Sequence, residues 1–242
     1  MLGGLRADTR ERFTALGRGV RFSGGERLLR EGEPGTEVYL LLQGWFKVLA
    51  TMDDAREALL AVRAGGDIVG ELACFDAQPR SATVMAVGKG TARLIGRQEF
   101  LGFLSDDDVA AQAVMRAVGG KLRWATRRRQ DFGGSDVHTR VARVLVELAR
   151  SYGRREGEGI AIGVTLSQPE LATLVGASEP SVHRVLRSLR QHRVIDTGYR
   201  RIFIRDGARL DAIAAADMTA LTAPTPRPPA IRPPTRRSPR PT

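Results

Sequence analysis

The segment that most constrains the fold of this chain is residues 167–189, in which a single glycine separates two stretches of helical periodicity. In the first stretch Leu171, Leu174 and Val175 recur on one helix face, and a serine stands at its start, where side-chain oxygens cap helices. Gly176 then permits the left-handed conformation that commonly ends a helix. The spacing predicts two helices that meet at a sharp corner.

The second of these helices has one apolar and one polar face. Ser178 can cap its N-terminus, and Pro180 falls in its first turn, where the missing N–H is tolerated. Its apolar positions are Val182, Val185, Leu186 and Leu189. Its outer positions are Glu179, Ser181, His183, Arg184, Arg187 and Arg190. Because arginine can donate two hydrogen bonds to a guanine edge, such a helix suits the major groove of DNA.

Residues 194–205 have the pattern of a β-hairpin and carry Arg200, Arg201 and Arg205, which could meet phosphates. We interpret this hairpin as the wing of a winged helix-turn-helix. A charged run is also typical of a merely solvated face, and two-helix corners occur in ordinary helical domains. The combination favours nucleic acid. The predicted DNA contacts are Gln168, Ser178, Glu179, Ser181, His183, Arg184, Arg187, Arg200 and Arg201.

The positive charge of the chain is concentrated around this motif. The net charge is +11, but residues 1–116 carry −1, residues 117–205 carry +9 and residues 206–242 carry +3. Codon bias could explain why arginine outnumbers lysine, since the only lysines are Lys47, Lys89 and Lys121, but it does not explain the uneven distribution. The asymmetry indicates a polyanionic partner for one domain only.

The N-terminal part has the pattern of a β domain. After a helical start at residues 5–16, residues 20–95 contain short β-prone runs separated by turns such as Gly65-Gly-Asp and Gly88-Lys-Gly. Many short strands at regular spacing are typical of a sandwich or barrel. We therefore expect residues 1–105 to form a mainly β domain.

Residues from Asp106 onward predict a long helix, whose first turn holds three aspartates that complement the helix dipole. Its apolar seam is Val114, Val118, Leu122 and Ala125. A helix of about 25 residues is roughly 37 Å long, which is more than one small domain covers, so we expect a second copy of the chain against it. Gly119-Gly120 either leaves this helix marginally ordered or allows close packing.

Breaks in the pattern divide the chain into units. Phe132-Gly-Gly-Ser-Asp predicts a hinge, and a second helix is expected over 137–152. Beyond residue 221 the chain is mainly Thr, Pro and Arg, which predicts a disordered basic tail because little apolar surface offsets the ordering entropy. The expected units are the β domain over 1–105, a dimerisation helix and hinge over 106–136, a DNA-binding domain over 137–210, and the tail over 222–242.

A candidate anion site lies in the β domain. Gly70-Glu-Leu is a tight glycine turn with an acid, and Arg80-Ser follows ten residues after the glycine. Backbone N–H groups, an arginine and a hydroxyl together suit a phosphodiester, and the carboxylate of Glu71 could accept a hydrogen bond from a ribose hydroxyl.

In these motifs and in their order the chain resembles the cAMP receptor protein, or Crp-Fnr, family over roughly residues 5–206. The resemblance implies an α+β fold with an N-terminal jelly-roll-like β-barrel that binds a cyclic nucleotide, a long dimerisation helix and a C-terminal winged helix-turn-helix. It also implies that Glu71 binds the ribose 2′-hydroxyl and that Arg80 and Ser81 bind the cyclic phosphate. The backbone that would assist them lies around Gly70, Leu72 and Ala82.

The chain departs from the family pattern in two places. Where the dimer helix of the family brings a Thr-Ser pair to the purine, this sequence has Ala125 and Thr126, so only Thr126 offers a hydroxyl. The usual Arg-Glu after the capping serine is replaced by Glu179-Pro180, while the later arginine is kept as Arg184. Arg184 is therefore the expected guanine contact, and Glu179 could accept from a cytosine amine or repel a phosphate.

Several other classes of protein are not supported. His138, His183 and His192 lack the spacing of a metal or catalytic site, and Cys74 is the only cysteine, so haem, an iron–sulfur cluster and enzyme activity are not expected. No apolar run approaches the ~20 residues of a membrane helix, and the start of the chain lacks the pattern of a signal peptide. We expect a cytoplasmic protein with no membrane partner.

The residues and the resemblance together predict a homodimeric transcription regulator whose affinity for double-stranded DNA is controlled by a cyclic nucleotide. cAMP is the expected effector, no other cofactor is expected, and RNA polymerase is a further expected partner. Two alternatives stay open: the same regulator with another ligand or none, and a cyclic-nucleotide-binding module that acts through protein contacts.

Overall fold

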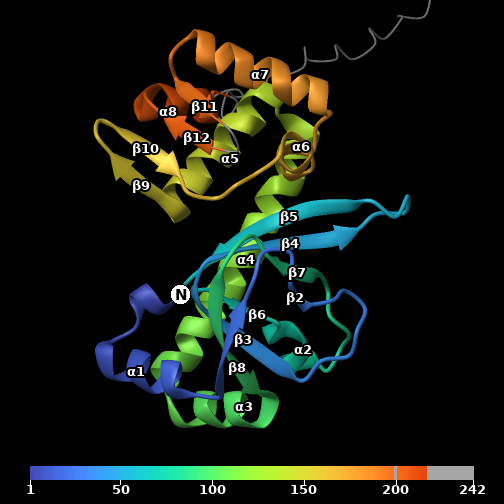
Figure 1. Ribbon diagram of the computed structural model, residues 1–242, viewed down its shortest axis with the longest axis vertical. Helices are drawn as coiled ribbons and strands as arrows, with labels where there is room; N and C mark the ends of the chain where they lie inside the picture. The colour runs from blue at the N-terminus through green and yellow to red at the C-terminus, as the bar shows by residue number, and fades with distance from the viewer. Residues whose placement is uncertain (199–200, 217–242) are drawn as a thin grey trace, which may run out of the picture.

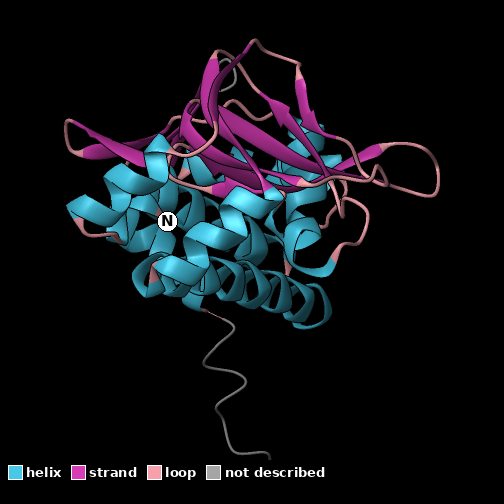
Figure 2. Cartoon of the chain, turned by 90° about the horizontal axis from the view of Figure 1, so that it is seen from below, coloured by secondary structure: helices cyan, strands magenta, loops and turns pink. Residues whose placement is uncertain are grey.

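The computed structural model describes residues 1–198 and 201–216, which form two lobes joined by one long helix (Figure 1). The lower lobe in Figure 1 holds the N-terminal strands and helices, and the upper lobe holds the C-terminal ones. Helix α4 (Asp108–Gly134) runs between them. Seen from below, the helices gather on one side and the strands on the other (Figure 2). Arg200 and the expected tail at 222–242 lie outside the described residues.

The N-terminal lobe is built from two antiparallel four-stranded sheets, of order β1-β8-β3-β6 and β2-β7-β4-β5. Its strands are β1 (Arg18–Phe22), β2 (Arg27–Leu29), β3 (Glu37–Gln43), β4 (Trp45–Thr51), β5 (Glu57–Ala64), β6 (Ile68–Val69), β7 (Thr83–Ala86) and β8 (Gly90–Gly96). Its helices are the 3-10 turn η1 (Leu2–Gly4), α1 (Ala7–Ala15), α2 (Glu71–Asp76) and α3 (Arg97–Asp106).

Among the described strands no backbone ladder joins the two sheets, so the closed barrel expected from the sequence is instead a pair of packed sheets. Buried side chains from both sheets form one cluster, which includes Leu41 of β3, Phe46 of β4 and Val84 of β7. Packing of one sheet on the other covers their apolar faces, so burial of these faces does not require closure by hydrogen bonds.

Helix α4 begins where the aspartates predict it. The carboxylate of Asp107 accepts a hydrogen bond from the backbone N–H of Ala110 at 2.9 Å and caps the helix. The helix continues through Gly119-Gly120 and then through residues 133–134, so the break lies at Ser135 and Asp136, later than the predicted start of the hinge. The ring of Phe132 packs so closely on Gly176 that a Cβ atom built on Gly176 would lie 2.0 Å from the ring. This contact holds the last turn of α4 in place.

The C-terminal lobe starts with α5 (Val137–Tyr152), which has the predicted bounds and is capped by Asp136. A hairpin of β9 (Gly153–Glu156) and β10 (Gly159–Ile162) follows, which the sequence did not predict. The predicted wing is the hairpin of β11 (Ile195–Gly198) and β12 (Arg201–Ile204), and all four strands form one sheet of order β11-β12-β10-β9. Helix α8 (Gly207–Ala215) packs on α5.

The two helices of the predicted corner are α6 (Gln168–Val175) and α7 (Glu179–Gln191). Ser167 and Glu170 form a reciprocal capping box at the start of α6, and Gly176 ends it with a φ of 67°. Ser178 stands at the N-cap of α7, but its hydroxyl donates to that of Ser181 at 2.9 Å and makes no bond to the helix backbone, so the predicted cap is wrong. The predicted inner face is buried at Val182, Leu186 and Leu189.

One hydrophobic core spans both lobes. Leu49, Leu59 and Val62 belong to the same buried cluster as the apolar faces of α5, α6 and α7. Trp45 of β4 also meets Tyr152 of α5 edge-on, with 5.2 Å between ring centroids. The C-terminal lobe is therefore docked on strands β4 and β5, which we call the β4–β5 ribbon (residues 45–64).

Candidate functional site

The anion motif folds as a turn of backbone around one buried arginine. Gly70 precedes α2 with a φ of 85°, a left-handed conformation that glycine adopts without strain. Arg80 is 5% exposed; its Nη1 donates to the carbonyl oxygen of Gly70 at 2.9 Å, and its Nη2 donates to that of Glu37 at 2.8 Å. A Cβ atom at Gly70 would lie 2.8 Å from Nη1, so the approach of the guanidinium also requires glycine. The structure brings the two ends of the motif together.

The buried carboxylate of Glu71 already has a partner. Lys121 of α4 donates from Nζ to Glu71 Oε1 at 2.8 Å and to the carbonyl oxygen of Ile68 at 2.7 Å. Burial lowers the pKa of Lys121, and the charge of Glu71 opposes that effect. Sequence reasoning missed Lys121 because it lies 50 residues from Glu71; the one available signal was a lone lysine in an arginine-rich helix.

A cavity of about 120 Å³ lies against these groups. The predicted cassette residues all line it, namely Gly70, Glu71, Leu72, Arg80, Ser81 and Ala82. Val48 and Arg63 of the β4–β5 ribbon and Lys121 complete its polar and apolar walls. Ligand sites usually span about 300–1,000 Å³, so a nucleotide requires side chains such as those of Arg63 and Lys121 to move.

Thr126, the predicted purine contact, lies elsewhere. It is exposed on α4 and does not line the cavity. Met115 and Leu122, which are 64% and 68% exposed, lie on the same side of the helix at spacings of seven and four residues. In a single chain Thr126 is therefore part of this exposed stripe of α4 and not of the cassette.

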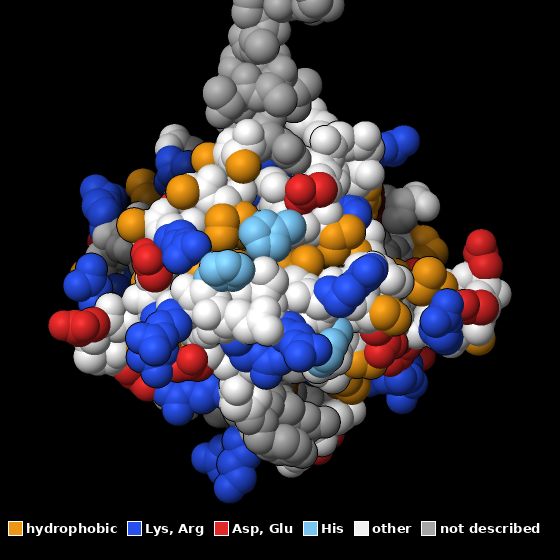
Figure 3. All heavy atoms as spheres, turned by 90° about the horizontal axis from the view of Figure 1, so that it is seen from above, with side chains coloured by type: hydrophobic (Ala, Val, Ile, Leu, Met, Phe, Trp, Pro, Cys, Tyr) orange, Lys and Arg blue, Asp and Glu red, His pale blue; other side chains and the backbone are white. Residues whose placement is uncertain are grey.

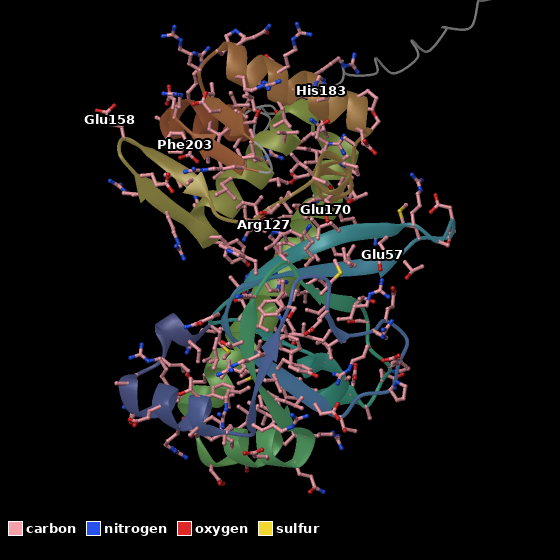
Figure 4. All side chains as sticks on the ribbon, viewed as in Figure 1. Glu57, Arg127, Glu158, Glu170, His183 and Phe203 are labelled. Atoms are coloured by element: carbon pink, nitrogen blue, oxygen red, sulfur yellow. The ribbon has the colours of Figure 1, made fainter. Side chains whose placement is uncertain are left out.

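The outer face of α7 presents the cations predicted to contact DNA. Figure 3 looks down on this end of the molecule, where Lys, Arg and His side chains are prominent, and Figure 4 labels His183 on α7. The exposed residues of this face are Ser178, Glu179, His183, Arg184, Arg187 and Arg190, while Ser181 is half-buried. Within the described residues none of these arginines pairs with a carboxylate; Arg184 and Arg190 donate only to the hydroxyls of Ser181 and Thr197, each at 3.2 Å.

A groove of about 250 Å³ lies between the start of α6, α7 and the wing. Its polar lining is Ser167, Gln168, His183, Arg190, Thr197 and Arg201. The capping box and Pro169 leave few N–H groups free at the start of α6, so a backbone phosphate in this groove would be held mainly by the side chains of Gln168, Arg190 and Arg201. The structure thus groups Gln168, His183 and Arg201, which the sequence analysis assigned to DNA contact from three separate elements.

The two described arginines of the wing, Arg201 and Arg205, differ from those of α7 because each has an acidic partner. Arg201 of β12 forms an ion pair with Glu156 of β9. Arg205 donates to Asp196 at 2.5 Å. All four side chains are about half exposed or more, so a phosphate would compete with a carboxylate for each arginine.

Three polar contacts fasten the C-terminal lobe to the β4–β5 ribbon. Lys47 donates to Glu170 at 2.5 Å, and Figure 4 shows Glu170 where the upper lobe meets β5. The backbone N–H of Leu59 donates to Thr173 Oγ1 at 3.0 Å, and the Tyr152 hydroxyl donates to the carbonyl oxygen of Val62 at 2.8 Å. Burial raises the pKa of Glu170, but hydrogen bonds from Lys47 and Ser167 outweigh it and leave this pKa below its ordinary value. Sequence reasoning missed these contacts.

The described ranges, 1–198 and 201–216, hold no cluster of three or more His, Cys, Asp or Glu side chains that could bind a metal ion. Cys74 is buried, and its thiol lies 3.6 Å from the carbonyl oxygen of Thr36. In that same part of the chain no helix has the length and apolarity needed to cross a membrane.

Comparison with known protein families matches both lobes. Residues 19–107 match the cyclic nucleotide-binding domain, a span that contains the whole Gly70–Arg80 cassette. Residues 139–213 match the Crp-like helix-turn-helix domain, a span that contains α6, α7 and the wing.

Several known transcription regulators are similar to most of the chain. The CRP-like cAMP-activated global transcriptional regulator of Mycobacterium tuberculosis is 30% identical over 191 residues, which cover 79% of this chain and 85% of that protein. The cyclic AMP receptor protein of Thermus thermophilus is 26% identical over 190 residues, which cover 78% and 85%. A solved transcriptional regulator of the CRP family, also from Thermus thermophilus, matches with a TM-score of 0.67 and 27% identity, over 81% of this chain and 96% of that one.

Proposed function

The chain belongs to the Crp/Fnr family of DNA-binding transcription regulators, and from this membership we propose that a cyclic nucleotide in the N-terminal lobe controls the affinity of a homodimer for duplex DNA. The observation that carries the proposal is the buried cassette, in which Gly70, Glu71 and Arg80 surround one cavity. cAMP is the proposed effector, as in the name of the Mycobacterium tuberculosis relative.

The chemistry of the cassette suits a cyclic phosphodiester bound to a ribose. Arg80 and the exposed hydroxyl of Ser81 would hold the phosphate, assisted by the backbone N–H groups at the start of α2. Glu71 would accept from the ribose hydroxyl, which requires it to share or exchange the ammonium of Lys121. Arg80 likewise already satisfies two carbonyl oxygens, so ligand binding exchanges internal bonds for ligand bonds.

The exposed stripe on α4 supports the homodimer. Met115 and Leu122 are large apolar side chains that water surrounds in a single chain, and burial of such groups drives association. A second copy packed there in parallel would cover them and place Thr126 of each chain near the dimer axis. A site for the purine that includes Thr126 would then be completed by the dimer.

The β4–β5 ribbon offers a path from ligand to DNA-binding lobe. Neighbouring residues on a strand point to opposite faces, so Val48 faces the cavity while Lys47 reaches Glu170. On β5, Arg63 lines the cavity and Val62 belongs to the core shared with α6. A ligand that moves Val48 or Arg63 therefore acts on the docking of α6 across a single layer of backbone. A second route that we propose is ordering of α4 around Gly119-Gly120 by the bound ligand, since glycines destabilise a helix interior.

For DNA we propose that α7 enters the major groove and that the two helices of the dimer contact half-sites about 34–36 Å apart. Arg184 is the proposed guanine contact, and Glu179 a proposed acceptor for cytosine. The roles proposed for phosphate contact fall to Gln168, Arg187, Arg200 and Arg201. RNA polymerase remains a proposed further partner.

The experiment is calorimetric titration of the purified full chain with cAMP, cGMP and linear AMP. Micromolar binding of one cyclic nucleotide, weakened at least tenfold by Ser81→Ala and by Glu71→Gln, supports the proposal. Ser81 is exposed, so its replacement leaves the fold intact. Absence of binding by all three nucleotides would overturn the cyclic-nucleotide sensor and leave a regulator with a different ligand or none.

A further inference from the structure

A second, larger cavity lies behind Lys121, outside the nucleotide cassette. It has a volume of about 350 Å³, which falls within the usual size of small-molecule sites. Strand β5 and the following turn supply Arg63 and Asp67, α4 supplies Arg116 and Trp124, and α5 supplies Glu147 and Tyr152. All three parts of the proposed switch, namely the sensor sheet, the long helix and the DNA-binding lobe, therefore meet around this one space.

The cavity is on the opposite face of α4 from the exposed apolar stripe. Ala113, Ala117, Gly120 and Trp124 line it at helical spacing. Met115 and Leu122 lie about half a turn away from that row, at 100° per residue. A second copy packed on the stripe would therefore leave the cavity uncovered, and the cavity is not a vacant half of the dimer interface.

Small residues create the space. Nothing lies within 4 Å of a Cβ atom built on Gly120, so this glycine opens directly onto the cavity, next to two alanines. Glycine within a helix interior is destabilising relative to alanine. The sequence analysis offered close packing of another element as one explanation of the Gly119-Gly120 pair, but no element of the described chain packs on Gly120. A bound molecule that occupies this space would explain why the position is glycine.

Two arginines of the lining are available to an anion. Within the described residues Arg116 forms no ion pair, and Arg63 donates only to the carbonyl oxygen of Val62 at 2.8 Å. The acids of the lining are less available: Asp67 Oδ2 already accepts from the Ala64 N–H at 3.1 Å and the Tyr152 hydroxyl at 3.3 Å. Burial raises the pKa of Glu147, because it disfavours the charged carboxylate that would pair with these arginines.

We propose that this cavity binds a small organic anion with an apolar body. Its charged group, a phosphate or a carboxylate, would lie between Arg63 and Arg116. Its apolar body would lie against Gly120 and Trp124, whose ring is covered by Arg128 at 4.6 Å from the ring centroid. The occupant contacts α5 and the sensor strand together, so it also fixes the position of the DNA-binding lobe.

The two cavities share a wall. Lys121 and Arg63 line both of them, so an anion that draws either side chain toward the second cavity changes the charge that the nucleotide meets in the first. Coupling of this kind is reciprocal: each ligand alters the affinity of the other by the same factor.

The test is calorimetric titration of the full chain with phenyl phosphate and, separately, with benzoate, which distinguishes the two charged groups. We expect saturable binding of at least one probe, weakened at least tenfold by Arg116→Ala and by Gly120→Leu, whose side chain would fill the cavity. Arg123→Ala removes the same charge from an exposed position of the same helix and should leave binding within twofold of the wild type.

Two results would overturn the proposal: no heat from either probe, or binding that survives Gly120→Leu but is lost in Ser81→Ala, which would place the probe in the cassette. Neither result contradicts nucleotide binding by the cassette, so the two proposals can fail independently. Coupling is measured by repeating the cAMP titration with saturating probe. We expect the dissociation constant to change at least threefold in the wild type and to stay constant in Gly120→Leu.

Discussion

The cations of the cassette and those of α7 are chemically alike but differently placed. Arg80 and Lys121 are largely buried and bond to carbonyl oxygens and carboxylates of the chain itself. Arg184 and Arg187 are exposed, and among the described residues neither is paired with an acid. A ligand of the cassette must therefore exchange buried internal bonds, whereas a phosphate that meets Arg184 or Arg187 breaks no ion pair of the described residues.

This difference separates a sensing site from a binding surface. Exchange of buried bonds couples ligand binding to the conformation of the surrounding fold, because an abandoned buried carbonyl or charge costs free energy. Exposed arginines that contact DNA phosphates instead displace the counterions condensed on the DNA, which adds affinity without a change in the conformation of the protein. The wing is intermediate, since Arg201 and Arg205 are exposed but paired with Glu156 and Asp196.

The largest expected effect that sharpens the comparison is on stability. Arg80→Ala leaves the carbonyl oxygens of Gly70 and Glu37 without their donors and should lower the free energy of unfolding by about 2–4 kcal/mol. Arg187→Ala, the matched change on α7, should alter it by less than about 0.5 kcal/mol. Urea denaturation of both variants measures the contrast, and equal losses would remove the distinction between the two sets.

The next effect is on DNA affinity. Arg184→Ala should weaken binding to a duplex obtained by in vitro selection by about 1–3 kcal/mol, because one base contact is lost. Arg187→Ala should weaken binding to the selected duplex and to random duplexes by the same factor. Fluorescence anisotropy on both duplexes provides the measurement. A fall that is the same on both for Arg184→Ala would show that this residue contacts only the backbone.

A smaller effect tests the join between the two regions. Lys47 is mostly buried against Glu170, so Lys47→Met should loosen the docking of α6 and raise the affinity for DNA in the absence of nucleotide a few-fold. The same contact gives a pH dependence, because the pKa of Glu170 is lower in the folded protein than in the unfolded chain. The ion pair stabilises the fold fully at a pH above the unfolded-state pKa, and this stabilisation is lost as the pH falls through the folded-state pKa.

Acid titration of the unfolding temperature checks this sign. The wild type should lose stability below pH ~4.5, and Lys47→Met should lose less, because the ion pair is already absent. A variant with the same acid slope as the wild type, and unchanged DNA affinity without nucleotide, would assign no role to the Lys47–Glu170 contact.

The smallest expected effect concerns Glu147. Burial raises the pKa of Glu147 in the folded protein above the pKa in the unfolded chain. Ionisation of Glu147 therefore lowers the stability as the pH rises from the unfolded-state pKa through the folded-state pKa. Glu147→Gln should remove that slope and raise the unfolding temperature at pH 7 by a degree or two, about the shift of a few tenths of a kcal/mol. A lower unfolding temperature at pH 7 would contradict this sign.

Local signals in the sequence predicted the parts of the fold that local chemistry decides. The bounds of α5 follow from Asp136 as cap and an apolar face, and the corner of α6 and α7 follows from Ser167, Gly176 and the apolar spacing. The Gly70–Arg80 motif was also recognisable, because its two ends are close in sequence.

Tertiary contacts account for what the sequence did not predict. Lys121 meets Glu71 only because α4 crosses the sensor sheets, and Lys47 meets Glu170 across 123 residues. Helix α4 extends past the predicted break because Phe132 packs on Gly176, which outweighs the low helix propensity of two glycines. The arrangement of strands as two sheets depends on pairings between distant segments, which periodicity does not reveal.

The measurement that tests the central claim most directly is the affinity of the full chain for a selected duplex with and without saturating cAMP, over a series of salt concentrations. The account predicts tighter binding with cAMP at every salt concentration, and a linear fall of log affinity with log salt in both states. Equal affinity with and without cAMP, in a protein that calorimetry shows to bind cAMP, would contradict control of the DNA-binding lobe by the cassette.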